Sequence, residues 1–297
     1  MASRNVIMTN LRGMRFELAA NFFASLRRTG YGGEVVTFAS GMADEDIAQL
    51  RRAGATVVPY RFYHLLTRRR LAWLWPVWRW FFQSGASQGA KEMLAVAVFH
   101  FFYRRQLLSL QFLREHRRDY DWVLLTDWRD VYFQADPFSW DLPAGVHLFL
   151  EDASNKIGRS RQHESWLESQ FGRAVYEELK AETISCAGTV LGDIDSVLKY
   201  LSRMIALIMN AGSLREAVGD QGIHNYLLYK ERLPEIILHE NGRGPILTLG
   251  AMRPEDVRLD PQGRVINDDN KIVPVLHQYD RIPHVEKALL QRLRQNI

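Results

Sequence analysis

The first sixty residues alternate between short apolar runs and segments whose apolar positions recur at helical spacing. The short runs, which we predict to be strands, cover 5–9, 34–38 and 55–59. Between them, 16–28 carries apolar residues three and four positions apart, and 44–54 repeats this pattern. Strands and helices that alternate at this pace predict a parallel sheet covered by helices, which is the α/β class.

The segment 60–118 differs in composition, because it is rich in Trp, Phe, Leu and Arg. A breaker cluster at 84–89 predicts two helices, the second ending near His116. Arginines and tryptophans interleave in its first part: Arg61, Arg68, Arg69, Arg70 and Arg79 with Trp73, Trp75, Trp78 and Trp80. Such composition is typical of a membrane-interface helix, of an acceptor-binding lid, or of an insertion packed on the sheet. Because buried, unpaired arginines are costly, we expect a basic, aromatic insertion beside the ligand cleft or at a membrane surface.

The pattern of the remaining chain continues the α/β alternation. It predicts strands at 121–126, 147–151 and within 182–191, helices at 165–180 and 195–211, and a basic helix from Pro283. No internal repeat is present. We therefore predict a single domain over 1–297, with a mostly parallel central sheet flanked by helices.

Composition and charge limit the partners. With 297 residues, 47% hydrophobic and 24% charged, the chain has the balance of a globular protein. A net charge of +4 suits an anionic small ligand or an anionic membrane and does not indicate nucleic acid. The single cysteine excludes an intramolecular disulfide. No secretory leader and no run of about 20 apolar residues is visible, so we expect a cytoplasmic protein, with peripheral attachment to the inner face of the membrane left open.

Two carboxylates directly follow the strand predicted at 121–126. They are Asp127 and Asp130, in the turn Asp-Trp-Arg-Asp. The carboxyl edge of a parallel sheet is where open α/β proteins bind ligands, and paired carboxylates suit Mg²⁺ or Mn²⁺. The alternative is a surface turn in which Arg129 neutralises a neighbour. Asp136 precedes a proline and is interpreted as a structural turn residue.

The longer string at 123–138 reads Val-Leu-Leu-Thr-Asp-Trp-Arg-Asp-Val-Tyr-Phe-Gln-Ala-Asp-Pro-Phe. It resembles the Asp-x-Asp region of GT-A nucleotide-sugar glycosyltransferases of the bacterial cell-surface glycan type, with one extra residue between the carboxylates. Further blocks resemble the same family in the glycogenin-like order: Ile-Ser-Cys-Ala-Gly-Thr-Val-Leu-Gly at 184–192, Asp-Gln-Gly-Ile-His-Asn at 220–225, and Val-Leu-His-Gln-Tyr-Asp-Arg at 275–281.

The resemblance implies a GT-A-like fold, and the transfer of a sugar from a nucleotide-diphosphate donor to a glycan or lipid-linked acceptor. It implies Mn²⁺ (or Mg²⁺) as cofactor, with metal ligands Asp127, Asp130 and His277. The donor-binding residues that it implies are Asp127, Arg129, Gly188, Thr189 and Arg281. It places the catalytic residues Asp220 and Gln221 near the anomeric carbon, and it favours retention of configuration.

Each block also has a plain structural interpretation when it is taken alone. Gly188 would mark a bulge in a buried strand, Asp220 would be a helix N-cap, and His277 would be a buried core residue.

Three other functions stay open. A sugar nucleotidyltransferase would carry a glycine-rich loop after the first strand, where 10–15 offers one glycine. A non-catalytic, membrane-associated glycan-binding protein would not hydrolyse nucleotide sugars. A single-stranded nucleic-acid binder would use the basic aromatic stretch, although no nucleic-acid signature accompanies it.

Overall fold

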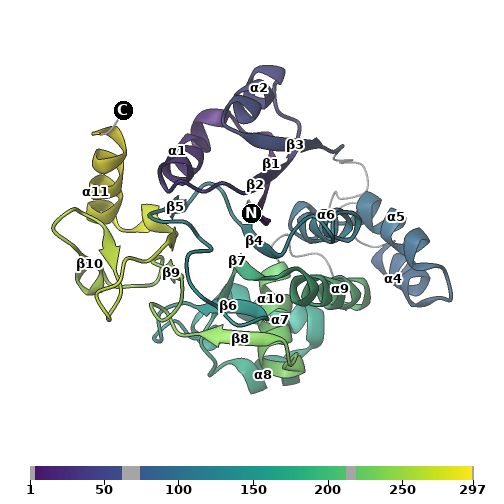
Figure 1. Cartoon of the computed structure of the whole chain (residues 1–297). Helices are drawn as coiled ribbons and strands as arrows, with labels where there is room; N and C mark the ends of the chain where they lie inside the picture. Colours follow the sequence, from purple (N-terminus) through teal and green to yellow (C-terminus); the bar gives the residue numbers. More distant parts are fainter. Residues whose placement is uncertain (1–3, 62–73, 212–218, 296–297) are drawn as a thin grey trace.

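The computed structural model describes residues 4–61, 74–211 and 219–295, and its centre is a seven-stranded sheet (Figure 1). The order is β3-β2-β1-β4-β7-β6-β8. The strands are β1 (Asn5–Arg12), β2 (Glu34–Ser40), β3 (Ala55–Pro59), β4 (Trp122–Thr126), β6 (Val146–Leu150), β7 (Ser185–Asp193) and β8 (Ile236–His239). Only β7 runs against its neighbours, β4 and β6. The predicted α/β class with a mostly parallel sheet is thus confirmed.

The first half of the sheet follows the predicted strand–helix alternation. After β1, a 3₁₀ turn (Phe16–Leu18) leads into α1 (Ala20–Arg28), and α2 (Asp44–Arg52) connects β2 to β3. Helix α1 buries Phe22, Phe23 and Leu26 against the sheet. The pairs β1–β2, β2–β3 and β1–β4 are all parallel, so the carboxyl ends of β1, β2, β3 and β4 meet at one edge.

The described part of 60–118 holds three helices, where the sequence pattern predicted two. They are α4 (Trp75–Gln83), α5 (Gln88–Val98) and α6 (Phe101–Glu115), and they lie beside the sheet at the right of Figure 1. The predicted second helix is interrupted at Phe99, whose backbone is extended and whose ring is fully buried. The Arg104 guanidinium donates to the carbonyls of Ala97 and Phe99 and so supplies the donors that the helix end lacks. Arg68, Arg69 and Arg70 lie outside the described residues.

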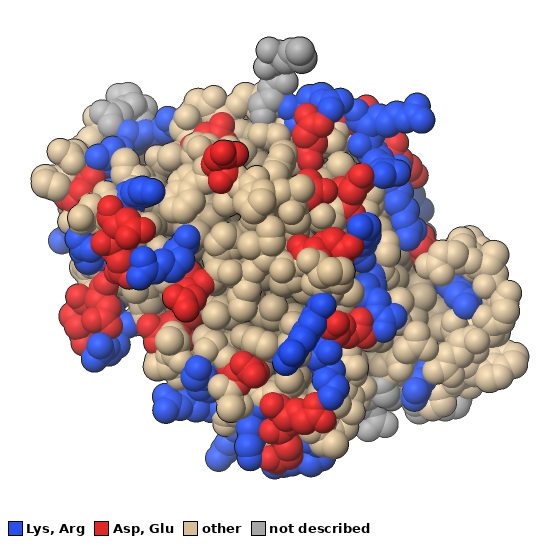
Figure 2. Space-filling model, turned by 60° about the horizontal axis from the view of Figure 1, so that its bottom comes forward, with Lys and Arg blue, Asp and Glu red and all other residues tan. Residues whose placement is uncertain are grey.

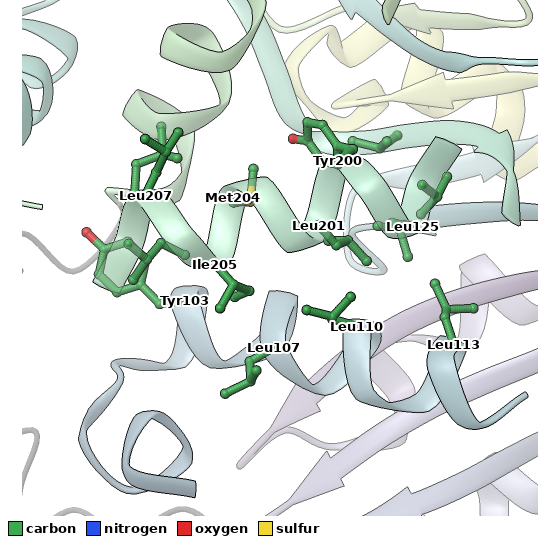
Figure 3. Close-up of a cluster of buried hydrophobic side chains, with 14 of the residues drawn as sticks. Tyr103, Leu107, Leu110, Leu113, Leu125, Tyr200, Leu201, Met204, Ile205 and Leu207 are labelled. Carbon is green, nitrogen blue, oxygen red and sulfur yellow. The ribbon is translucent and has the colours of Figure 1, made fainter. Parts of the chain in front are cut away.

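Helix α6 packs along α9 (Ile194–Asn210), and both lie on the sheet. Leu110 of α6 points toward Leu201 of α9 (Figure 3), and both side chains are fully buried.

The predicted helix 165–180 is instead two helices, α7 (Arg161–Phe171) and α8 (Arg173–Leu179). They are separated by Gly172, whose φ of +90° interrupts the helix.

The last third of the chain adds α10 (Asp220–Tyr226), a π-helical turn (Leu227–Glu231) and small sheets. One sheet joins β5 (Val131–Phe133), β12 (Val275–His277) and β9 (Ile246–Thr248), and the other joins β10 (Arg258–Leu259) to β11 (Val265–Ile266). Short 3₁₀ turns cover Ile157–Arg159, Pro254–Asp256 and Tyr279–Arg281, and α11 (Pro283–Arg294) is the predicted basic helix. Because β12 pairs with β5, the segment 275–277 lies directly beside the Asp127–Asp130 turn.

Candidate functional site

Asp127, Asp130 and His277 meet at the carboxyl end of β4. Asp127 is the first residue after the strand, and its N–H donates to the carbonyl of Gly188, at 2.8 Å. The carbonyl of Asp130 accepts from the N–H of Gln278, at 2.6 Å, which ties the turn to the end of β12. His277 Nε2 lies 3.9 Å from Asp127 Oδ2 and 3.9 Å from Asp130 Oδ1. The predicted metal ligands are therefore brought together, with one ligand atom of each inside a span of 4.8 Å.

Two features of this group fit a divalent cation. Among the described residues His277 Nε2 has no hydrogen-bond partner although it is buried, and Nδ1 on the other side of the ring lies 3.5 Å from Thr248 Oγ1. A Cβ added to Gly188 would lie 2.7 Å from Asp127 Oδ2 and 2.8 Å from His277 Nε2, so only glycine leaves this space open. Two carboxylates with one imidazole suit Mn²⁺ better than Mg²⁺.

Asp130 is the more buried of the two carboxylates. Desolvation raises its pKa, His277 lowers it, and Asp127 and Asp280 raise it again. The net direction is upward mainly because burial penalises the charged carboxylate, and the repulsion from Asp127 and Asp280 adds to this effect. A bound cation would relieve this repulsion, which is the ordinary reason for placing carboxylates side by side.

Arg105 of α6 links the metal group to α10, and the sequence analysis did not single it out. Its Nη1 donates to Asp127 Oδ1 at 2.5 Å, while Nη2 and Nε donate to Asp220 Oδ2 at 2.8 and 3.1 Å. The guanidinium also lies 5.3 Å from the ring centre of Phe102. Burial lowers the pKa of Arg105, but Asp220 and Asp127 outweigh this, so the pKa is raised. The available signal was the arginine pair Arg104 and Arg105 among the apolar residues of 101–110, since a charge that is buried in a helix face requires a partner.

Asp220 is not a helix N-cap, so that interpretation is wrong. Gly219 occupies the N-cap, and the Asp220 side chain is buried, where it also accepts from Gln106 Nε2 at 3.3 Å. Desolvation raises the pKa of Asp220, although Arg105 lowers it. The N-cap prediction for Asp220 failed because it considered only neighbouring residues, whereas the side chain binds Arg105, which lies 115 residues away in the sequence.

The amides of Gln221 and Asn225 fasten α10 to β7. Gln221 Oε1 accepts from the N–H of Ala187 at 2.7 Å, and its Nε2 donates to the carbonyl of Ser185. Asn225 Oδ1 accepts from the N–H of Ser185 at 2.9 Å. The pairing of β6 with β7 shifts its register next to this segment, so these side chains replace part of the strand ladder and position Gly188. The catalytic role of Gln221 stays a prediction.

The other residues predicted to bind the donor lie at different depths. Arg129 and Arg281 are half-exposed on either side of Asp280, with nitrogens 3.9 and 3.5 Å from its carboxylate. Thr189 is fully buried on β7, and its hydroxyl has no partner among the described residues. Donor binding by these three residues stays a prediction. Asp136 accepts from the N–H of Phe138 at 2.9 Å, so it closes a turn as expected.

Two cavities of small-molecule size are lined by residues near the metal group, Trp128 in the first and Glu151 in the second, whereas Asp127 and Gly188 line a third cavity of only about 30 Å³. The first, of about 880 Å³, lies at the ends of β1, β2 and β3 and is lined by Arg12, Gly13, Met14, Ser40, Gly41, Tyr60, Arg61, Phe101, Phe102 and Trp128. The second, of about 400 Å³, lies beyond β6 and includes Glu151, Asp152, Glu240 and Asn267 in its wall. Burial raises the pKa of Glu151, while Asn155 and the nearby His277 lower it. Both volumes are typical of small-molecule sites.

Comparison with known proteins adds little to this geometry. No family model and no curated protein matches the sequence. Among solved structures, the chain is similar to core-mannan synthase A from Aspergillus fumigatus in its Mn/GDP form, with 11% sequence identity, coverage of 80% of this chain and 72% of that chain, and a TM-score of 0.41. Similarity of this size identifies neither the family nor the substrate of this chain.

Proposed function

We propose that this protein is a divalent-metal-dependent glycosyltransferase that moves a sugar from a nucleotide-diphosphate donor to a glycan or lipid-linked acceptor. The observation that carries the proposal is the group Asp127, Asp130 and His277 around an open space at a sheet edge, next to the cavity that Trp128 lines. The resemblance of four motifs to GT-A glycosyltransferases supports the same activity. The metal is Mn²⁺ in this proposal, because imidazole is a better ligand for Mn²⁺ than for Mg²⁺.

The donor would lie across the metal group. Asp127, Asp130 and His277 would hold the cation, which would supply positive charge to the leaving nucleoside diphosphate. The nucleoside would occupy the larger cavity, where Arg12 and Arg61 supply positive charge beside Trp128. Arg129 and Arg281 would contact phosphate at the mouth, because the guanidinium fork matches phosphate oxygens. Gly188 and Thr189 would bound the sugar side of the site.

Arg105 and Asp220 would fix the position of the donor sugar. Arg105 is held by two carboxylates, so its guanidinium has one orientation and can present a constant positive charge to the reacting centre. Asp220 would act near the anomeric carbon through Arg105, whose guanidinium it holds in place, and Gln221 would keep β7 in register. The acceptor would enter from the second cavity, past Glu151, and transfer would proceed with retention of configuration.

A panel of nucleotide sugars tests the proposal. Each donor is incubated with the protein, with and without Mn²⁺, and the released nucleoside diphosphate is measured. We expect slow hydrolysis of one donor that requires Mn²⁺ and is lost in Asp130→Ala. Release of pyrophosphate from a nucleoside triphosphate and a sugar phosphate would assign a nucleotidyltransferase instead. Binding of a glycan without turnover of any donor would assign a non-catalytic protein.

A further inference from the structure

Helices α4 and α5 carry an exposed apolar surface that nothing else in the described chain covers. Six large hydrophobic side chains are exposed in the described residues, and three of them belong to these two helices. They are Val77, Trp80 and Met93, with 59%, 72% and 74% of their surfaces exposed. An apolar group gathered on one projection marks an interaction surface more strongly than scattered single residues do.

Helix α4 is apolar on both of its sides. The inner side packs into the core through Trp75 and Phe82, and Trp75 Nε1 donates to the carbonyl of Ala211 at 2.9 Å. Val77 and Trp80 are three residues apart, so they share the outer side of the helix. A helix that is apolar all round requires apolar surroundings on every side, and the fold supplies them on the inner side only.

The charges of the projection are positive. Glu92 is the only carboxylate in 74–98, and it is buried, where it accepts from Arg114 Nη1 at 2.6 Å and from Gln88 Nε2 at 2.9 Å. Arg79 and Lys91 are partly exposed, with the Nε of Arg79 buried, and no carboxylate in this range is exposed. The projection at the right of Figure 2 is accordingly mostly uncharged, with Lys and Arg as its charged groups.

We propose that the α4–α5 projection docks on an anionic lipid bilayer, with Val77, Trp80 and Met93 in the apolar boundary and Arg79 and Lys91 at the phosphates. The described chain contains no helix that is long and apolar enough to cross a membrane. A nine-residue helix is about 14 Å long, against about 30 Å of hydrocarbon, so α4 lies in the interface. Tryptophan is enriched at that depth, and cations are attracted to anionic lipid.

This surface is separate from the metal ligands, so the docking does not rest on the proposed function. The experiment is co-sedimentation with phosphatidylcholine vesicles, prepared with and without phosphatidylglycerol. The test variant combines Val77→Ser, Trp80→Ser and Met93→Gln. The matched control combines Leu18→Ser and Leu238→Ser, which remove exposed apolar side chains elsewhere.

We expect the protein to sediment with the anionic vesicles, less so at high salt and less with phosphatidylcholine alone. The test variant should bind at least tenfold more weakly, which corresponds to about 1.4 kcal/mol, since it loses all three side chains that the apolar boundary would bury. The control variant should bind as the unmodified protein does, and the test variant should unfold cooperatively on heating as the unmodified protein does, which shows that the fold is intact.

Two outcomes would overturn the proposal. One is the absence of vesicle binding by the unmodified protein, or equal binding by the test variant. The other is a concentration-dependent dimer, seen by light scattering, that the test variant loses while no form of the protein binds vesicles. That result would assign the surface to a second copy of the chain.

Discussion

Gly188→Ala is the sharpest perturbation of the metal group. The added methyl would lie 2.7 Å from Asp127 Oδ2 and 2.8 Å from His277 Nε2, whereas non-bonded contacts settle at about 3.5 Å or more. One or both ligands must therefore move by roughly 0.7 Å, and His277 is fully buried and has little room. Metal sites tolerate deviations of about 0.2 Å. We expect Mn²⁺ affinity to fall at least a hundredfold, or about 2.7 kcal/mol.

The assay is calorimetric titration of Mn²⁺ into the unmodified protein, Gly188→Ala and Gly32→Ala. Gly32 is the matched control, because a Cβ there meets nothing within 4 Å. Urea unfolding without metal measures the separate cost of crowding, about 1–3 kcal/mol for an overpacked site. The reasoning is refuted if Gly188→Ala stays folded and its Mn²⁺ affinity is within about twofold of that of the unmodified protein. In that case the space beside Gly188 does not hold the cation.

Three further predictions concern the neighbouring charges. Arg105→Met leaves the buried Asp220 carboxylate unpaired, so the free energy of unfolding, measured by urea denaturation, should fall by about 3–5 kcal/mol at neutral pH. Adding Asp220→Asn should recover part of this loss. If the losses of the two single variants simply add in the double variant, the two residues do not form a coupled pair. His277→Ala should weaken Mn²⁺ binding more than Mg²⁺ binding, and equal losses in two titrations would indicate a packing role. Burial lowers the pKa of His224 from 6.5 to about 3 in the folded protein. Between pH 6.5 and pH 3 the unfolded chain therefore binds a proton at this residue that the folded protein does not bind. The free energy of unfolding should accordingly fall by about 1.4 kcal/mol for each pH unit below about 6.5. His224→Gln should flatten that slope, and an unchanged slope in acid unfolding would contradict the assignment.

Local pattern was sufficient for the elements on which the site is built. The alternation at the N-terminus predicted β1, β2 and β3, and the apolar run before Asp127 predicted β4, because burial of consecutive apolar residues decides these strands. The helix breaks were harder to predict. Gly172 lies inside a helical pattern and interrupts it, and the break at Phe99 depends on Arg104 covering the free carbonyls.

Contacts between distant segments explain what the sequence analysis missed. The residues next to Asp220 made an N-cap role reasonable, but its ion pair with Arg105 decides its role. Arg105 lies on α6, and the packing of α6 against the sheet and α10 cannot be deduced from the spacing of residues along the sequence. His277 is different, because only its place in an ordered series of motifs marked it. Its ring reaches Asp130 since β12 pairs with β5, a pairing between strands about 140 residues apart.

The most direct test of the central claim is a calorimetric titration of nucleoside diphosphates with and without Mn²⁺, on the unmodified protein and on Asp130→Ala. The account predicts that one nucleoside diphosphate binds only when Mn²⁺ is present, and that Asp130→Ala abolishes this binding while its thermal unfolding still shows a cooperative fold. Binding that is equally strong without metal, or that Asp130→Ala leaves intact, would contradict the claim that Asp127, Asp130 and His277 hold the cation that binds the diphosphate.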